Sequence, residues 1–159
     1  GCDALTEAIA EGRRIIEGLR PAVLDDLGLA AALEEITYSA SQAAGWQVQC
    51  TVDPLSVEPD KTLSVTLFRI AQEALNNVRK HAQADAISVH LSNGDGLQLT
   101  IRDNGRGFNP TAERSRGMGI TTMRERAHLV DGRCIITSAP GLGTTVEVWV
   151  PGTWQERQP

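Results

Sequence analysis

Residues 67–84 read Leu-Phe-Arg-Ile-Ala-Gln-Glu-Ala-Leu-Asn-Asn-Val-Arg-Lys-His-Ala-Gln-Ala, and this stretch decides how the rest of the chain is arranged. Wound as a helix, it carries an apolar stripe typical of a core-facing surface, formed by Leu63, Leu67, Ile70, Ala74 and Val78. A polar stripe borders it at i, i+4, i+7 and i+8, formed by Glu73, Asn77, Lys80 and His81. An acid, an amide and two bases beside a buried face indicate a functional site. A capped amphipathic helix with one Glu-to-Lys pair explains the same residues, and this helix alone does not decide between the two.

The bulk composition is that of one ordinary soluble domain. The 159 residues suffice for a single domain with a real core. The net charge of -5 argues against a general nucleic-acid binder. The three cysteines, Cys2, Cys50 and Cys134, are odd in number and widely spaced, which favours a reducing compartment. No apolar run reaches membrane-spanning length and no signal peptide is visible, so we expect a cytoplasmic location.

The N-terminal part predicts helices. Residues 3–19 carry apolar residues at heptad-like spacing, which indicates a truncated bundle helix. Arg20-Pro21 interrupts this pattern, and a second helix is predicted from Leu29 to Ala44, with Gly45 as its stop. The chain begins Gly-Cys-Asp rather than with Met, which predicts a fragment of a longer protein whose upstream segments could include a membrane anchor.

From Trp46 the pattern changes to short strands. The segments expected to be strands are 46–52, 86–91, 97–101, 133–138 and 144–150, and Asn93-Gly94-Asp95-Gly96 is a hairpin signal. Asp60 is placed to cap the long helix, and a second helix follows a polar loop over residues 104–117 and ends near Val130. We expect an α+β fold with a layer of helices over a mixed sheet. The predicted division is a bundle remnant and junction helix over 1–45, a domain over 46–151 and a polar tail over 152–159.

Asp103 is the most informative single residue outside the long helix. The alternation of Leu97, Leu99 and Ile101 places its carboxylate on the core-facing side, where an unpaired charge is costly. Gly105 and Gly107 follow it at once and let the backbone come close to another group. The tetrapeptide alone favours an ordinary Asp-Asn-Gly turn, but a buried acid beside a glycine-walled slot also suits an amine-bearing base such as adenine.

Two further glycine segments are ambiguous by themselves. Gly117-Met118-Gly119-Ile120 precedes a helix, where free amide groups and the helix dipole favour phosphate, although a plain loop-to-helix junction reads the same. Gly141-Leu142-Gly143-Thr144-Thr145 reads by default as a hairpin turn. A second interpretation is that one of its threonines places a hydroxyl near a ligand.

The combination of these motifs resembles the ATP-binding (Bergerat) fold shared by gyrase, Hsp90, MutL and sensor histidine kinases, a two-layer α/β sandwich. Residues 72–82 resemble the N box of the NarL-partnered, DesK-like sensor histidine kinases, 103–108 their first glycine box, and 117–127 their second glycine box and following helix. Leu19-Arg20-Pro21 and the residues up to Leu33 resemble the end of that subfamily's dimerisation domain. The resemblance covers nearly the whole chain up to Pro151.

The resemblance implies a set of roles around bound ATP and Mg²⁺. Asn77 would ligate Mg²⁺, and Glu73 would orient a metal-bound water or take a proton from the attacking imidazole. Lys80 and His81 would meet phosphate charge, and Asp103 would accept from the adenine amino group with Gly105 and Gly107 leaving room for the ring. The remaining expected nucleotide contacts are Gly117, Met118, Gly119 and Ile120 at the phosphates and Thr144 or Thr145 at the adenine end. Residues 108–116 would form a short, mobile lid.

One departure from the family pattern limits the expected activity. The family phosphorylates a histidine on the first helix of a dimeric bundle, whereas the histidines here are His81, His90 and His128, none in such a box. We therefore expect a monomeric fragment that does not autophosphorylate in isolation. Its expected partners are the dimerisation domain of a homodimeric parent and, downstream, a response regulator. His90 and His128 are expected to be structural and partly exposed. An ATP-hydrolysing machine of the gyrase or Hsp90 type, a non-catalytic nucleotide-binding module and a serine-kinase anti-sigma factor are the alternatives.

Overall fold

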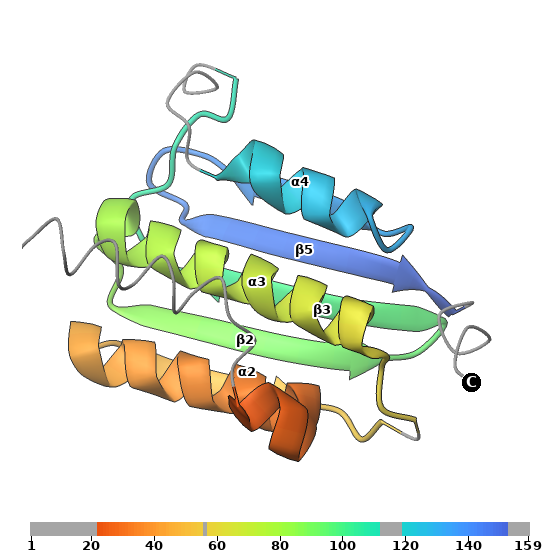
Figure 1. The fold of residues 1–159 in the computed structure, drawn as a ribbon. Helices are drawn as coiled ribbons and strands as arrows, with labels where there is room; N and C mark the ends of the chain where they lie inside the picture. Colours follow the sequence, from red (N-terminus) through yellow and green to blue (C-terminus); the bar gives the residue numbers. More distant parts are fainter. Residues whose placement is uncertain (1–21, 56, 112–118, 153–159) are drawn as a thin grey trace, which may run out of the picture.

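The computed structural model describes residues 22–55, 57–111 and 119–152, which form two layers (Figure 1). One layer is a five-stranded sheet in the order β1-β2-β3-β5-β4. Its strands are β1 (Gln47–Val52), β2 (Ala86–Asn93), β3 (Gly96–Asp103), β4 (Arg133–Ser138) and β5 (Thr144–Pro151). β1 pairs with β2 in parallel and the other three pairings are antiparallel. The sheet is therefore mixed, as predicted, and the predicted hairpin joins β2 to β3.

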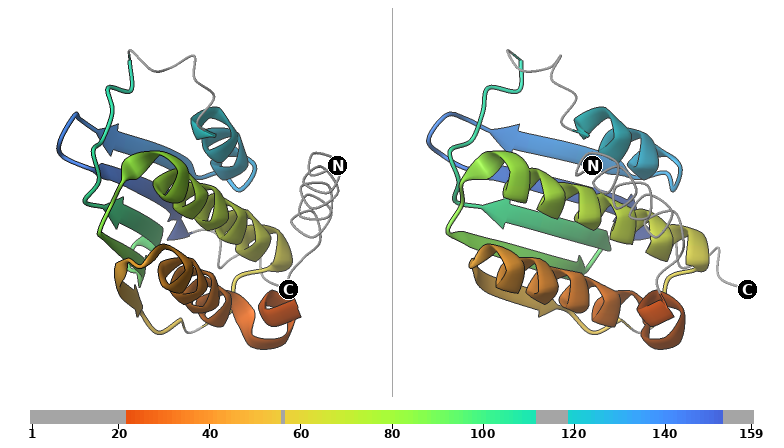
Figure 2. Two further views of the ribbon diagram at one scale, coloured as in Figure 1. Left: turned by 90° about the vertical axis from the view of Figure 1, so that its left-hand side faces the viewer. Right: turned by 60° about the vertical axis from the view of Figure 1, so that its left-hand side comes forward.

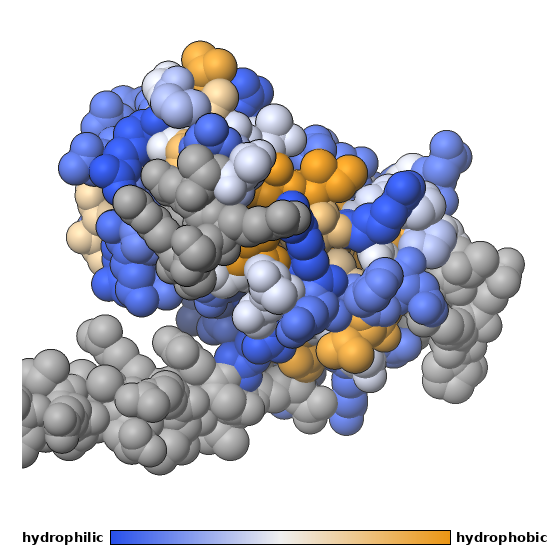
Figure 3. Space-filling view, turned by 90° about the horizontal axis from the view of Figure 1, so that it is seen from above, coloured by the Kyte–Doolittle hydropathy of each residue, from blue (hydrophilic) through white to orange (hydrophobic). Residues whose placement is uncertain are grey.

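The described helices cover one face of this sheet (Figure 2). They are α2 (Ala22–Ala44), α3 (Lys61–Asn77), the π-helical turn η1 (Val78–Ala82) and α4 (Ile120–His128). Because side chains alternate along a strand, Val146, Val148 and Val150 of β5 are buried beneath the helices, and the residues between them lie on the uncovered face. Viewed from above, apolar residues form a central patch among hydrophilic ones (Figure 3). Among the described residues, no helix combines the length and apolar character that a membrane crossing requires.

The long helix α3 lies at the centre of the helical layer, between α2 and α4 (Figure 1). Asp60 caps it as predicted, because its Oδ1 accepts a hydrogen bond of 2.8 Å from the amide of Leu63. All five residues of the predicted apolar stripe are buried, together with Phe68 and Ala71 on the flanks. Truncation of a buried leucine such as Leu67 is expected to cost about 2–5 kcal/mol.

The prediction of one regular helix through Ala84 is wrong at its end. The α-helix ends at Asn77, and the chain continues as a π-helical turn to Ala82, followed by Gln83 in the left-handed region at φ 53°. A π turn takes more residues than an α turn, so it changes the direction in which the side chains after Asn77 point.

The first described helix also differs from its predicted form. It is broken at Gly28, where φ is 88° and ψ is -179°; the part after the break matches the helix predicted from Leu29 to Ala44, whereas the helical residues from Ala22 up to the break were not predicted. Glu58 supports the break, because its Oε1 accepts a hydrogen bond of 2.7 Å from the amide of Leu29. A Cβ on Gly28 would lie 2.7 Å from that same oxygen, so the position requires glycine.

The second half of α2 packs into the same hydrophobic core as α3 through Leu29 and Leu33. The predicted division of the chain at residue 45, into a bundle remnant with its junction helix and a separate domain, stays a prediction. Three predicted segments lie outside the described residues in whole or in large part: the helix over 3–19, the lid over 108–116 and the tail over 152–159.

Candidate functional site

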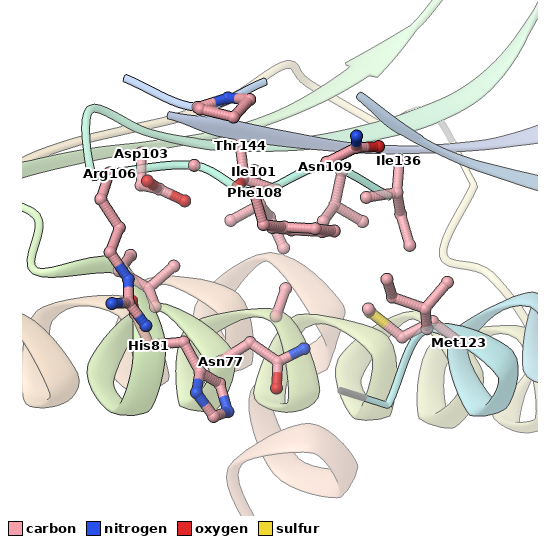
Figure 4. Close-up of a pocket in the computed structure, with 17 residues that line it drawn as sticks. Asn77, His81, Ile101, Asp103, Arg106, Phe108, Asn109, Met123, Ile136 and Thr144 are labelled. Atoms are coloured by element: carbon pink, nitrogen blue, oxygen red, sulfur yellow. The ribbon is translucent and has the colours of Figure 1, made fainter. Parts of the chain in front are cut away.

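A cavity of about 260 Å³ opens between the helical layer and the ends of the central strands (Figure 4). This volume is close to the lower end of the range for small-molecule sites, roughly 300 Å³. The helical wall consists of Ala74, Asn77, Val78, His81 and Ala82, with Ile120 and Met123 from α4. The other wall consists of Ile101, Asp103, Arg106, Gly107, Phe108 and Asn109, with Ile136, Pro140, Thr144 and Val146 from β4, β5 and their turn. The lining is mostly apolar and has a few polar groups, which is typical of a ligand site.

Asp103 lies at the end of β3 on the helix-covered face and is only 5% exposed, as predicted. Its Oδ1 accepts a hydrogen bond of 2.7 Å from the amide of Gly105, and the amide of Thr144 also donates to the carboxylate. Burial raises the pKa of Asp103 above its ordinary value, and the two backbone donors only partly oppose this rise. The sheet thus holds a carboxylate at the wall of a largely apolar cavity.

Gly105 and Gly107 are required by their neighbours in the chain. A Cβ on Gly105 would lie 2.7 Å from the Cβ of Ala82, at the end of the π-helical turn. Gly107 has φ +64°, and a Cβ there would collide with the carbonyl oxygen of Ala139. Gly107 lines the cavity, whereas Gly105 is not among the lining residues and lies against Ala82. Their predicted role of leaving room for a ring stays a prediction.

The four residues of the predicted polar stripe take three different positions. Asn77 and His81 line the cavity (Figure 4). Lys80 lies in the π-helical turn after Asn77, where it is exposed and is not part of the lining. Glu73 packs against Gly119, where an added Cβ would lie 2.6 Å from its carboxyl carbon.

Arg106 joins this turn to the opposite wall and was not predicted as a site residue. Its Nε donates a hydrogen bond of 2.5 Å to the carbonyl of His81, and its amide donates one of 2.7 Å to Ala82. These are carbonyls at the end of a helix, which lack partners within the helix. Arg106 therefore closes the π-helical turn from outside, and its guanidinium lies at the cavity wall beside His81 (Figure 4).

The glycine segment before α4 is described only in part. Gly119 is the N-cap of α4 with φ 76°, and Ile120 lines the cavity. Gly117 and Met118 lie outside the described residues.

The two threonines of the last strand lie on opposite faces of the sheet. Thr144 stands opposite Asp103 in the β3–β5 register and lines the cavity. Thr145 is the next residue along the strand, so its side chain projects from the uncovered face. Ser138 of β4 supports this wall, because its Oγ accepts a hydrogen bond of 2.9 Å from the amide of Phe108 and lies 2.9 Å from the Oγ1 of Thr144.

The other two histidines lie away from the cavity. The Nε2 of His90 is 3.2 Å from the Oδ1 of Asp53, and both side chains are substantially exposed, at 49% and 40%. His128 is exposed on α4. Within the described part of the chain, no cluster of three or more histidine, cysteine or acidic residues is suited to hold a metal ion.

Sequence reasoning did not name the cavity residues Arg106, Met123, Ile136 and Pro140 as site residues, and it placed Asn109 only within the expected lid. The strand alternation of β4 could have indicated Ile136, and the helical spacing from Ile120 could have indicated Met123. Arg106 and Asn109 lie in a loop, where no periodic pattern indicates which way a side chain points.

The described structure combines a mixed five-stranded sheet, helices on one of its faces and a cavity with a buried acid in its wall. Residues 62–153, more than half of the chain, match the family model of histidine kinase-, DNA gyrase B- and HSP90-like ATPases. The chain belongs to this family, and the predicted fold class is confirmed.

Its curated relatives include sensor histidine kinases. The sensor histidine kinase MctS of Rhizobium johnstonii is 37% identical over 155 residues, covering 95% of this chain and 33% of MctS. The histidine-protein kinase/phosphatase DegS of Brevibacillus brevis is 34% identical over 150 residues, covering 94% of this chain and 39% of DegS. The chain thus spans between a third and two fifths of the length of these relatives. The resemblance to sensor histidine kinases is confirmed.

Solved structures of the same kind share the fold. The histidine kinase domain of a blue-light activated histidine kinase from Erythrobacter litoralis EL346 matches with a TM-score of 0.66 and 22% identity, covering 80% of this chain and 63% of that one. The mycobacterial sensor histidine kinase MprB matches with a TM-score of 0.60 and 21% identity, covering 76% of this chain and 91% of that one.

Proposed function

We propose that this chain is the ATP-binding catalytic domain of a sensor histidine kinase. In this role it transfers the γ-phosphoryl group of Mg-ATP to a histidine on a dimerisation domain, from which a response regulator receives it. The observation that carries the proposal is that Asn77 and Asp103, on different elements, line one cavity (Figure 4). An arrangement with these two side chains on separate surfaces would have been incompatible with the function.

The residues present fit the adenine end of the nucleotide. An ionised carboxylate accepts hydrogen bonds and does not donate them, so Asp103 suits an exocyclic amino group. The apolar side chains of Ile101, Ile136 and Val146 lie on the same face of the sheet and line the cavity. A flat aromatic base fits between such surfaces, and its amino group gives the buried carboxylate a partner.

The residues present also fit a magnesium-bound phosphate chain. Mg²⁺ prefers hard oxygen ligands and keeps several waters and phosphate oxygens, so one amide oxygen from Asn77 is a suitable protein contribution. When bound, the ion neutralises phosphate charge during transfer. The cationic Arg106 guanidinium and the imidazole of His81 line the cavity and suit an anionic ligand, although the chain as a whole has a net charge of -5.

We propose that the phosphoacceptor lies outside this chain. His81 belongs to the cavity wall, and His90 and His128 lie on the surface away from it. Transfer therefore requires a second domain that presents its own histidine to the cavity. The present chain supplies positioning and charge neutralisation.

The test is Mg²⁺-dependent binding of a fluorescent ATP analogue to wild type and two variants. Asp103→Asn replaces one acceptor oxygen by a donor and should weaken adenine recognition with or without Mg²⁺. Asn77→Asp should leave Mg²⁺-free binding nearly unchanged and alter the dependence on Mg²⁺. The matched control is Asn76→Asp, because Asn76 is the adjacent amide, lies outside the lining and accepts from the Nη2 of Arg79 at 2.7 Å. Wild-type binding in both site variants would refute the proposed site.

A further inference from the structure

The hydroxyl of Ser138 takes part in three hydrogen bonds behind the cavity wall. Its Oγ accepts from the amide of Phe108 at 2.9 Å and donates to the carbonyl of Gly143 at 2.9 Å. A third contact of 2.9 Å joins it to the Oγ1 of Thr144, where either oxygen could donate by geometry alone. Counting protons decides the direction of this third bond.

A serine hydroxyl has one proton and two lone pairs. The carbonyl of Gly143 can only accept, so the proton of Ser138 is committed to it. The amide of Phe108 can only donate, so it occupies one lone pair. The second lone pair remains for Thr144, which must therefore donate its own hydroxyl proton to Ser138.

This direction determines what Thr144 offers to the cavity. Thr144 lines the cavity, and its single proton points toward Ser138, so its Oγ1 has only lone pairs to offer a ligand there. Thr144 is paired with Asp103 on β3 and with Ser138 on β4, so the three side chains form a row across adjacent strands on one face. The cavity end of this row presents two acceptors, a hydroxyl oxygen and a carboxylate.

We propose that Ser138 is a positioning residue that fixes the Thr144 hydroxyl as a hydrogen-bond acceptor, so that the cavity selects a nucleobase carrying an amino group over one carrying a carbonyl. The inference rests on the proposed function, since it concerns the base end of the same site. Hypoxanthine carries a carbonyl in place of the amino group of adenine, and its N1 carries a proton. Its carbonyl oxygen would face the Thr144 hydroxyl oxygen and the carboxylate, which would lose the amino donor and meet a third acceptor in a buried site.

The experiment compares the dissociation constants of ATP and ITP, measured by competition against the fluorescent ATP analogue. Wild type should prefer ATP clearly. In Ser138→Ala the Thr144 hydroxyl loses its acceptor and can turn its proton into the cavity, so the ITP-to-ATP ratio of dissociation constants should fall about 5–10-fold. A purely structural defect raises both constants by the same factor, so an unchanged ratio overturns the proposal.

Three single variants and one double variant sharpen the test. Ser138→Thr keeps one proton and two lone pairs, so its ratio should stay within about twofold of wild type. Thr137→Ala removes a hydroxyl from the neighbouring residue, which is exposed on the uncovered face, and should leave the ratio unchanged. Thr144→Val should lower the ratio, and adding Ser138→Ala to it should cause no further change.

Thermal unfolding of each variant shows whether it folds. If Ser138→Ala does not fold, Thr144→Val still decides the matter, and an unchanged ratio in that variant overturns the proposal. Wild type that binds ATP and ITP equally also overturns it while leaving the proposed function intact. Wild type that binds no ATP overturns the proposed function itself.

Discussion

The Nε of Arg106 donates a hydrogen bond of 2.5 Å to the carbonyl of His81, which joins the loop after β3 to the π-helical turn. The two residues belong to opposite walls of the cavity (Figure 4). The bond therefore fixes the separation of the walls at this end and holds the backbone that carries the His81 imidazole.

Arg106→Ala should lower the affinity for nucleotide clearly while lowering the free energy of unfolding only slightly. The backbone bond to Ala82 remains, so the free energy of unfolding should fall by about 1 kcal/mol or less. The affinity for the ATP analogue should fall about tenfold, because the turn loosens and a cation leaves the cavity wall. Faster hydrogen exchange at residues 78–82 would report the loosened turn. Arg102→Ala removes an exposed arginine from the uncovered face of β3 and should change neither quantity.

Gly107→Ala should destabilise the protein severely. Its φ of +64° disfavours a side chain, and the added Cβ would collide with the backbone of Ala139. We expect a loss of at least about 3 kcal/mol, measured by urea unfolding. Gly141→Ala is the matched control, because Gly141 also has positive φ, at +81°, but an added Cβ meets nothing within 4 Å. It should cost only about 1 kcal/mol, and equal losses at the two positions would contradict this interpretation.

Nucleotide binding should decline with acidification at a higher pH than an ordinary aspartate would produce. Burial raises the pKa of Asp103, so its carboxyl takes up a proton early and then no longer accepts with both oxygens. The effect on stability has the opposite sign. Because the folded-state pKa is raised, the contribution of Asp103 to stability is present below the unfolded-state pKa and is lost as the pH rises through the folded-state value.

Titration of the dissociation constant between neutral and mildly acidic pH checks this expectation. In Asp103→Asn this component of the pH dependence should disappear. At neutral pH the free energy of unfolding of the same variant should be close to that of wild type, since the substitution removes a buried charge. A pH profile identical to that of wild type would show that another group controls binding.

Incubation of this chain alone with Mg-ATP should produce no phosphohistidine. His81 is part of the cavity wall, and the other two histidines lie away from it. Acid-labile, base-stable phosphate bound to the protein is the measurement. Its appearance would identify an acceptor within these residues and contradict the proposal that the histidine lies elsewhere. Phosphate release to water at a high rate would instead favour the ATP-hydrolysing alternative.

Most of the fold follows from local patterns in the sequence. Strand alternation located all five strands, and Asp60 and the hairpin residues located the boundaries of α3 and of β2 and β3. The same alternation placed Asp103 on the buried face, because inward and outward positions are fixed once the neighbouring leucines are assigned.

The features that were missed depend on distant residues. The π-helical turn is closed by Arg106, and the break at Gly28 is supported by Glu58, so both depend on residues far away in the sequence. Helical spacing placed Lys80 beside Asn77; it lies in the π-helical turn, exposed and outside the cavity lining, and its role at the phosphates stays a prediction. The bonds of Ser138 could not be predicted either, since they require the β4–β5 register and the path of the loop through Phe108.

The main chain at position 106 is held on both sides, because its amide donates to Ala82 and its carbonyl accepts from Gly141 at 2.6 Å. These two bonds do not use the side chain, so a residue other than proline can keep the backbone path here, although the bond from the guanidinium to His81 is then lost. Evolution or a protein engineer can therefore exchange the guanidinium for another group and retune one wall of the cavity without dismantling the architecture.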